Sequence, residues 1–319
     1  MQHAPIKPLQ RCQIEPLPQR QFSFRIDGSE CTRWHFGGDA PRPFFYPIVG
    51  PSGVSLTRMG HPGAPNHDHH RSFWFAHHDL LGASYWTEET PARIEQSQWY
   101  AIEDGDEFAR IAFELLWRDG HDPTPVLKQD VFVTIRPQPS LGEGAWSLEL
   151  QCDFKAEAEG VEFAQSNFGV LGLRVAKSLS VVFGAGKITG ASGGVDEKDL
   201  FGRPNRWVDY SGPVGLNAAG EAVREGLTLI DHAGNPGHGS DAWASWHVRN
   251  DGWIGPSLTR SGPLLIAPGS PVTCRYALLV HAADCQPSAV DALADVFDAR
   301  SLLRVQKGTS SHVQWEIAG

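Results

Sequence analysis

The chain has 319 residues, of which 27 are Lys or Arg and 37 are Asp or Glu, so its formal net charge is −10. This acidic balance and the lack of a basic run argue against nucleic acid or an anionic membrane as the main partner. No apolar run approaches the roughly 20 residues that span a bilayer, and the first residues lack the apolar core of a signal peptide. We therefore expect a cytoplasmic protein with a small, uncharged ligand.

The length allows one large β domain or two smaller ones, and the 34 glycines and 23 prolines suit many tight turns between short strands. The five cysteines are widely spaced and form no CxxC pair, so we expect reduced cysteines that serve packing. The chain contains no P-loop and no GxGxxG before a helix. We therefore expect neither a nucleotide nor a flavin cofactor.

Most of the elements predicted in chain order are strands. After a proline-rich, extended lead-in, residues 22–26 alternate as a strand should, and residues 54–58 are predicted to form a strand that leads into a histidine-rich segment. Beyond Trp86, apolar side chains recur with a period of two, which is typical of a half-buried antiparallel sheet. The strands predicted there are 110–117, 130–135, 146–154, 169–175, 179–183, 227–231 and 271–281. In the last of them, Thr273, Arg275 and His281 share one face.

One segment predicts a helix. Ser288 is its expected N-cap, and apolar residues follow with helical spacing at Val290, Leu293, Ala294 and Phe297. No internal repeat, long linker or composition break divides the chain. The predicted fold class is therefore all-β, a large antiparallel β-sandwich with one peripheral C-terminal helix. We predict an extended lead-in and first strand over residues 1–40, and a single sandwich domain over residues 41–319.

Histidines are concentrated in the segment from residue 61 to residue 78. The six are His61, His67, His69, His70, His77 and His78. Imidazole is the usual ligand of several transition metals, and its charge changes near neutral pH. On an extended backbone His67 and His69 would share a face, about 7 Å apart, and could bind a divalent metal ion with a third ligand. The candidates for that ligand are His232, His238, His247, His281, Asp231, Glu88 and Glu89. The simpler alternative is a surface loop whose histidines bond to backbone carbonyls and carboxylates.

Arginine and tryptophan are the residue types expected to hold a sugar. A guanidinium group offers a planar fork of donors, and an indole ring offers an apolar surface for the C–H face of the sugar. The predicted substrate-binding residues are Arg42, Trp74, Trp86, Arg174, Arg206, Trp207 and Trp243. Residues 232–255 form a second concentration of aromatic and histidine side chains, which includes Trp253. For each tryptophan taken singly, burial in the core is the simpler expectation.

The motifs RPFFYP (42–47), HDHHRSFWF (67–75) and GASYW (82–86) resemble a family of bacterial proteins that carry the label "methane oxygenase PmoA-like". Because this chain has no run that could span a bilayer, we treat the label as a misnomer. The resemblance covers residues 40–285. It implies a sandwich similar to the galactose-mutarotase supersandwich, in proteins of bacterial sugar catabolism. Residues 82–84 depart from the Asn-Gly pattern of the relatives, so the substrate need not be the same.

Three functions are compatible with these features. The first is a carbohydrate-active enzyme that acts on a glycoside or a keto-sugar by hydrolysis or elimination. Its predicted catalytic residues are His70, His77, Arg71 and His232, and its predicted metal ligands are His67, His69 and His281. The second is a metal-free, mutarotase-like epimerase in which two histidines exchange protons with the sugar. The third is a non-catalytic sugar-binding module. In each case a homo-oligomer is compatible with the sequence.

Overall fold

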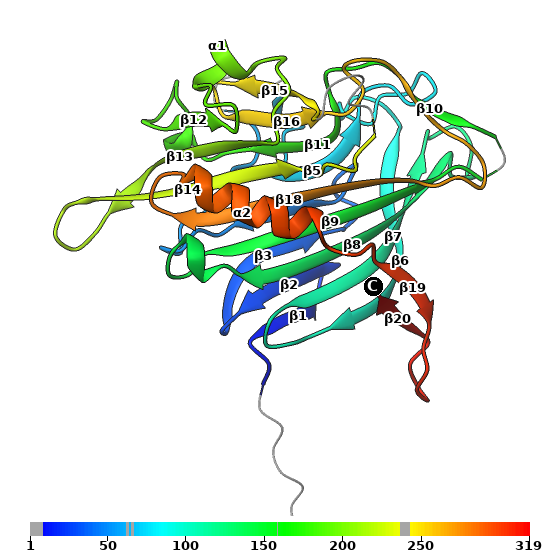
Figure 1. Ribbon diagram of the computed structural model, residues 1–319. Helices are drawn as coiled ribbons and strands as arrows, with labels where there is room; N and C mark the ends of the chain where they lie inside the picture. Colours follow the sequence, from blue (N-terminus) through cyan, green and yellow to red (C-terminus); the bar gives the residue numbers. More distant parts are fainter. Residues whose placement is uncertain (1–8, 62–63, 65–66, 158, 237–242) are drawn as a thin grey trace, which may run out of the picture.

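The computed structural model describes residues 9–61, 64, 67–157, 159–236 and 243–319. Two eight-stranded antiparallel sheets pack face to face, and the main hydrophobic core lies between them (Figure 1). A single long helix lies on the outer face of the second sheet. The prediction of an all-β antiparallel sandwich with a peripheral C-terminal helix is confirmed. No helix in the described part of the chain is long and apolar enough to cross a membrane.

The first sheet has the strand order β1-β2-β3-β4-β5-β11-β16-β15. Its strands are β1 (Cys12–Leu17), β2 (Gln21–Ile26), β3 (Ser29–His35), β4 (Phe44–Ile48), β5 (Phe73–His77), β11 (Gly169–Arg174), β15 (Ser245–Arg249) and β16 (Trp253–Ser257). The domain boundary predicted at residue 40 falls between β3 and β4, which pair with each other. The predicted lead-in thus supplies three strands of this sheet.

The second sheet has the strand order β12-β13-β14-β18-β9-β8-β7-β6. Its strands are β6 (Arg93–Glu103), β7 (Ala109–Arg118), β8 (Leu127–Pro137), β9 (Trp146–Lys155), β12 (Lys187–Gly190), β13 (Trp207–Leu216), β14 (Ala222–Asp231) and β18 (Val272–Ala282). Two small sheets pair β10 (Val161–Phe163) with β17 (Leu264–Ile266) and β19 (Arg304–Lys307) with β20 (Trp315–Ala318). The helices are α1 (Asp196–Leu200), α2 (Pro287–Asp298) and the 3₁₀ turns η2 (Pro139–Leu141) and η3 (Lys177–Leu179).

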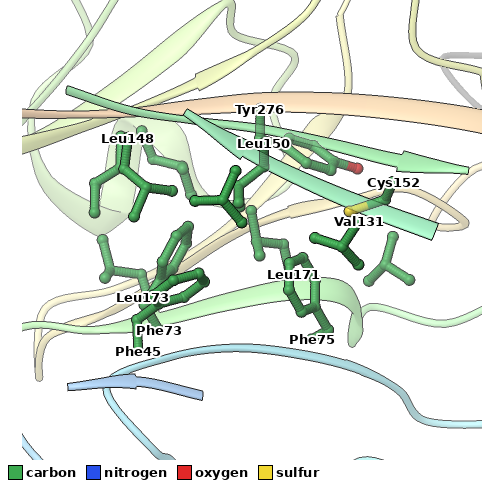
Figure 2. Packing of buried hydrophobic residues seen from close by; sticks show 14 of the residues in the cluster. Phe45, Phe73, Phe75, Val131, Leu148, Leu150, Cys152, Leu171, Leu173 and Tyr276 are labelled. Atoms are coloured by element: carbon green, nitrogen blue, oxygen red, sulfur yellow. The ribbon is translucent and has the colours of Figure 1, made fainter. Parts of the chain in front are cut away.

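Apolar side chains that alternate along the strands of both sheets fill the core. Leu148 and Leu150 of β9 are buried between the sheets, as are Phe73 and Phe75 of β5 (Figure 2). Burial of each such side chain contributes about 1.5–3 kcal/mol to the stability of the fold. Because successive side chains point to opposite faces, the intervening residue Glu149 lies on the outer face of the second sheet. Every strand near the core therefore also presents a second set of residues to the outside.

Two of the predicted strands are wrong. Residues 54–58 form only isolated bridges, at Ser55 and Thr57. Residues 179–183 continue from η3 into a turn in which the hydroxyl of Ser180 donates a hydrogen bond to the carbonyl of Lys177 and accepts one from the amide of Phe183. A serine that bonds to neighbouring backbone groups in this way offers an alternative to a strand.

Helix α2 packs on the second sheet through the residues that the helical spacing predicts. Val290, Ala294 and Phe297 are buried in a small cluster on the outer face of that sheet. The helix begins one residue before Ser288, with Pro287 in its first turn and Gln286 as N-cap, so the predicted N-cap is wrong. Proline fits the first turn of a helix because no hydrogen bond from its nitrogen is needed there.

Candidate functional site

Trp74 of β5 points away from the core, onto the outer face of the first sheet. It is fully buried there in a separate aromatic cluster that includes Trp86 and Trp253 of β16. Gly172 of β11 lies opposite Trp74 in the sheet, and a Cβ atom at this position would come within 2.6 Å of the indole. Glycine is required because the indole lies flat across the neighbouring strand.

We call Trp74, Trp86 and Trp253 the aromatic floor. The ring centroids of Trp74 and Trp86 are 5.3 Å apart, and those of Trp86 and Trp253 are 5.8 Å apart. Half-buried Phe168 contacts the floor, with its ring 5.7 Å from that of Trp86. Each aromatic pair of this kind contributes about 0.5–1.5 kcal/mol beyond its burial. The floor is therefore a rigid surface against which other groups can be positioned.

Residues 67–70, which we call the histidine turn, lie over this floor. The amide of His70 donates to the carbonyl of His67 at 3.0 Å, so the segment is a tight turn and not the extended backbone on which His67 and His69 would share a face. The ring of His69 is 5.8 Å from that of His67 and 4.4 Å from that of His70. The turn thus gathers three imidazoles more tightly than a strand would.

His70 is the member of the histidine turn that packs on the floor. Its ring stacks on Trp74, with centroids 5.4 Å apart, and lies 6.2 Å from Trp253. Burial lowers the pKa of His70 far below its usual value, and the neighbouring His69 and Arg174 lower it further. The imidazole is therefore neutral at neutral pH, and a neutral ring can accept a hydrogen bond or a proton.

Four buried ring nitrogens around the floor have no hydrogen-bond partner in the described part of the chain. They are Nδ1 of His70, Nε1 of Trp74, Nδ1 of His247 and Nε1 of Trp253. His247 of β15 contacts Trp253 with centroids 4.4 Å apart, and burial, then Arg249, lowers its pKa to about 4. Buried polar groups in proteins are nearly always paired. These nitrogens are therefore candidates to bond a ligand.

Arg174, at the end of β11, adds further donors beside the same surface. Its side chain is fully buried, and one of its NH₂ groups donates to Asp251 at 2.9 Å. Among the described residues, its Nε and its other NH₂ group have no hydrogen-bond partner. Asp251 also lies 3.2 Å from Nε2 of His61. Burial opposes ionisation of Asp251, but its hydrogen bond to Arg174 and the charge of Arg174 hold its pKa below the usual value.

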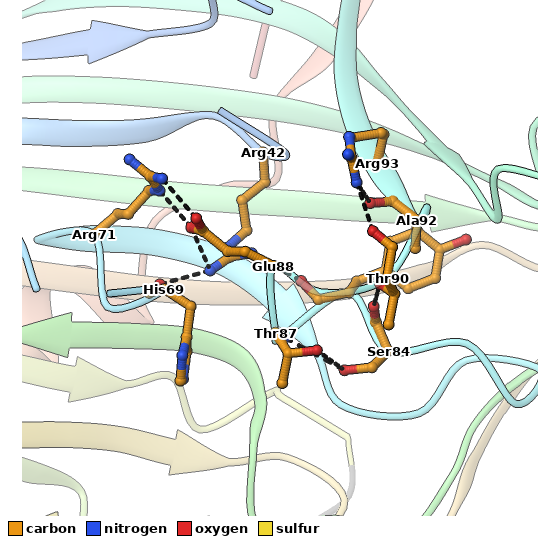
Figure 3. Close-up of polar contacts among 10 residues, drawn as sticks. Arg42, His69, Arg71, Ser84, Thr87, Glu88, Thr90, Ala92 and Arg93 are labelled. Atoms are coloured by element: carbon orange, nitrogen blue, oxygen red, sulfur yellow. Dashed lines mark hydrogen bonds and ion pairs between the residues drawn. The ribbon is translucent and has the colours of Figure 1, made fainter. Parts of the chain in front are cut away.

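Glu88 joins two predicted arginines beside the histidine turn (Figure 3). Arg71 donates to both carboxylate oxygens of Glu88, at 2.5 and 2.7 Å, and a guanidinium nitrogen of Arg42 lies 3.6 Å from the same carboxylate. Arg42 is buried and also donates to the carbonyls of His69 and Tyr85. Burial opposes the shift, but Arg71 and then Arg42 hold the pKa of Glu88 below its usual value. This network fixes the position of the histidine turn.

Several predicted site residues lie on the outer face of the second sheet, away from the histidine turn. Nε2 of His281 is 2.7 Å from Asp209, and its strand neighbour Leu279 packs under α2. The structure therefore does not assemble the predicted metal set of His67, His69 and His281. No group of three or more His, Cys, Asp or Glu in the described part of the chain is arranged to hold a metal ion.

The Arg206–Trp207 block anchors α2. Arg206 pairs with Asp298 at 2.6 Å, and Nε1 of Trp207 donates to Asp291 at 2.7 Å. Two further predicted site residues also contact arginines in this part of the chain. The guanidinium of Arg206 lies over the ring of Trp243, and His232 contacts Arg275. A role of these residues in binding the substrate of the histidine turn is not supported by this placement.

The other predicted residues divide between the core and parts of the chain that are not described. His77 faces the core beside Phe163, with Nε2 3.0 Å from the carbonyl of Ala164. Asp231 is buried in the second sheet and accepts hydrogen bonds from Asn235 and Ala244. His238 lies outside the described residues. Sequence reasoning missed Phe168 and Asp251, because each stands alone in a loop without a local motif.

The comparison with protein families gives one match. A family described as being of unknown function, DUF6807, matches residues 21–295. The match covers nearly all of both large sheets, the histidine turn and the aromatic floor. No curated protein matches the chain. The resemblance to PmoA-like proteins and to mutarotases therefore stays a prediction.

Proposed function

This chain belongs to the DUF6807 family of unknown function, and from its candidate site we propose that it is a carbohydrate-active enzyme that transfers a proton on its substrate through neutral imidazoles. The observation that carries the proposal is the position of His70. Its neutral ring is stacked on Trp74, and its Nδ1 has no hydrogen-bond partner among the residues that the structure describes. A neutral ring nitrogen fixed in this way is positioned to accept a hydrogen bond or a proton from a substrate.

The chemistry around His70 suits a sugar. The rim of the site is made by half-buried aromatic rings, namely His67, His69, His247 and Phe168. Rings of this kind support the apolar faces of a sugar. The unpartnered nitrogens of Arg174 can donate hydrogen bonds to its oxygens. An acidic chain with this mixture of donors and rings fits a neutral, oxygen-rich ligand better than a phosphate.

The carboxylates of the site favour elimination over hydrolysis. Most glycosidases use a pair of carboxyl groups, one of them protonated because its pKa is raised. Glu88 and Asp251 are both held in ion pairs with arginines, and the pKa of each is lowered. Neither is suited to donate a proton to a leaving group. The imidazoles are then the groups that can move the proton.

The proposed reaction acts on a keto-sugar. His70 takes the proton from the carbon next to the carbonyl, and the electron pair of that C–H bond forms an enolate. Arg174 stabilises the enolate oxygen by donated hydrogen bonds. The electron pair of the enolate then forms a carbon–carbon double bond to the next carbon, while the C–O bond of that carbon breaks. The leaving oxygen receives a proton from the imidazolium of His70, which returns to its neutral form.

Epimerisation is a second candidate, because two imidazoles approach the same indole. His70 and His247 lie 6.2 and 4.4 Å from Trp253, measured between ring centroids. One imidazole could remove the proton and the other could return it from the other side of the substrate. In this reaction both histidines are required, and no bond to oxygen breaks.

A panel of keto-sugars and oxidised glycosides, followed by NMR in D₂O, tests both candidates. Elimination gives an unsaturated product with loss of the leaving group, whereas epimerisation gives deuterium exchange with inversion. The His247→Gln variant should keep elimination activity and lose epimerisation activity. Sugar binding by calorimetry without any turnover would instead support a binding module and contradict the enzymatic proposal.

The predicted divalent metal ion has its own test. Metal analysis of the purified chain and of a His67→Ala/His69→Ala double variant reports whether the histidine turn binds a metal. Loss of a stoichiometric metal in the double variant would support metal-assisted chemistry. An equal metal content in the two proteins would contradict a metal site at the turn.

A further inference from the structure

A cavity of about 510 Å³ lies on the outer face of the second sheet, apart from the histidine turn. Its floor is formed by outward-facing residues of β7, β8, β9 and β18. Its walls come from the end of α2, the segment after it and the chain end at β20. Figure 1 shows α2 and the β19–β20 pair on the two sides of this part of the sheet.

Positive charge dominates the cavity. Four arginines line it, Arg110, Arg136, Arg275 and Arg300, whereas Glu149 is the one acidic side chain among the lining residues. Each arginine comes from a different element, so the fold rather than a local motif brings them together. The charge of the cavity is opposite to the net charge of −10 of the whole chain. Such a local excess of one sign attracts ligands of the other sign.

Arg110 pairs with Glu103 at 2.6 Å, but the ion pairs around the cavity do not neutralise all of the other three arginines. Glu149 accepts a hydrogen bond from Nε of Arg300 at 2.9 Å and lies 3.3 Å from Nε of Arg136, so two arginines share one carboxylate. Arg275 contacts neutral groups, the carbonyl of Arg300 and the ring of His232. A guanidinium that donates to a neutral carbonyl keeps its full charge, and its remaining N–H groups can bind an anion.

The cavity also has an apolar part. Phe132 of β8 and Phe297 of α2 line it, together with Leu303. Phe297 lies 5.2 Å from the guanidinium carbon of Arg275, measured to the ring centre. A ligand that fits this lining carries an oxyanion at one end and a compact apolar or ring-shaped body at the other.

We propose that this cavity is a second ligand site, which binds a small organic molecule through a phosphate or carboxylate group held by Arg136, Arg275 and Arg300. The planar guanidinium fork suits both groups because it can donate two parallel hydrogen bonds. The body of the ligand rests against Phe132 and Phe297. This site is independent of the chemistry proposed for the histidine turn.

Titration calorimetry of the full chain with phenyl phosphate, benzoate and inorganic phosphate tests the proposal. Phenyl phosphate should bind more tightly than inorganic phosphate, because its ring adds the apolar contact. Comparison of the affinities for phenyl phosphate and benzoate identifies whether the site prefers a phosphate or a carboxylate group. Affinity should fall with rising salt concentration. If none of the three compounds binds, the proposal is wrong.

Variants locate the binding. An Arg136→Gln/Arg300→Gln double variant should bind phenyl phosphate about tenfold more weakly, or worse, because two charged donors are lost. Arg118→Gln is the matched control, since Arg118 lies on β7, pairs with Glu95 and does not line the cavity. Glu149→Gln should bind more tightly, a gain that misfolding cannot produce. Unchanged affinity in both the double variant and Glu149→Gln would overturn the proposal.

Discussion

The imidazole of His70 lies stacked on the indole of Trp74, with ring centroids 5.4 Å apart and planes inclined by 24°. The contact joins a turn of irregular structure to the middle of a regular strand. Trp74 is fully buried and is held in place by its neighbours. The imidazole that stacks on it is therefore also held in one position. This relationship is the reason for assigning the proton transfer to His70.

Replacement of His70 by Gln should reduce turnover at least about 100-fold, since a positioned acid–base group contributes about 10²–10⁴ to the rate. The KM should change little, because the floor and Arg174 remain. Steady-state kinetics on a substrate found in the panel measures both constants. His78→Gln, in an exposed neighbour, is the control and should behave as the unmodified protein. Retained activity in His70→Gln would assign the proton transfer to another residue.

Replacement of Glu88 by Gln should destabilise the fold by about 1–3 kcal/mol, because buried Arg42 loses its counter-charge. Urea denaturation measures the change, and Glu89→Gln, in an exposed neighbour, is the control. The pKa of Glu88 is lowered in the folded chain. Its stabilising effect is therefore present above the unfolded pKa of about 4.3 and is lost as the pH falls through the folded pKa. The difference between the two proteins should shrink in acid.

Replacement of Gly172 by Ala should displace Trp74, because the added Cβ would meet the indole at 2.6 Å. Overpacking of this kind costs about 1–3 kcal/mol. Denaturation curves and tryptophan fluorescence report the loss of stability and the movement of the ring. Gly215→Ala, at a strand position where an added Cβ meets nothing within 4 Å, should leave both unchanged. Equal behaviour of the two variants would contradict the flat placement of the indole.

The His281–Asp209 pair should make stability depend on pH. Burial opposes protonation of His281, but the charge of Asp209 and its hydrogen bond raise the pKa of His281 above the usual value. Its contribution to stability is then complete below the unfolded pKa of about 6.5 and is lost as the pH rises through the folded pKa. Denaturation of His281→Gln should therefore differ most from the unmodified chain in mild acid. His121→Gln, in an exposed loop, should show no such dependence.

Alternation of apolar and polar residues predicted much of the second sheet. Residues 146–154 lie within β9, and all of the predicted strand 271–281 except residue 271 lies within β18. Arg275 and His281 share one face, opposite Cys274, Tyr276 and Leu278, as the alternation predicts. The alternation of apolar and polar residues indicates which side chains of one strand share a face, and this property depends only on neighbouring residues. It says nothing about which of two sheets a strand joins. For this reason the prediction places His281 and His67 in one site, although His281 lies on the second sheet and His67 lies in the turn over the first.

The candidate site was predictable only in part, because a sequence pattern reports local properties and not contacts between distant residues. The concentration of histidines predicts a site at residues 67–70, and Trp74 and Trp86 lie beside His70 and His69. The turn itself was not predictable, because it depends on Arg42 and Glu88 holding the segment from distant positions. Arg206 and Trp207 resemble ligand-binding residues in the sequence because the acidic side chains of α2 that pair with them are 92 and 84 residues away.

The outward placement of Trp74 has a consequence for how this protein can change over evolution. On β5 the residues on one side secure the structure and those on the other side shape the candidate site, so ligand preference can drift without loss of the fold. The same arrangement makes insertions dangerous. One extra residue within β5 would rotate all following side chains by half a turn, placing an imidazole-stacking indole inside the sandwich and a phenyl ring under the histidines.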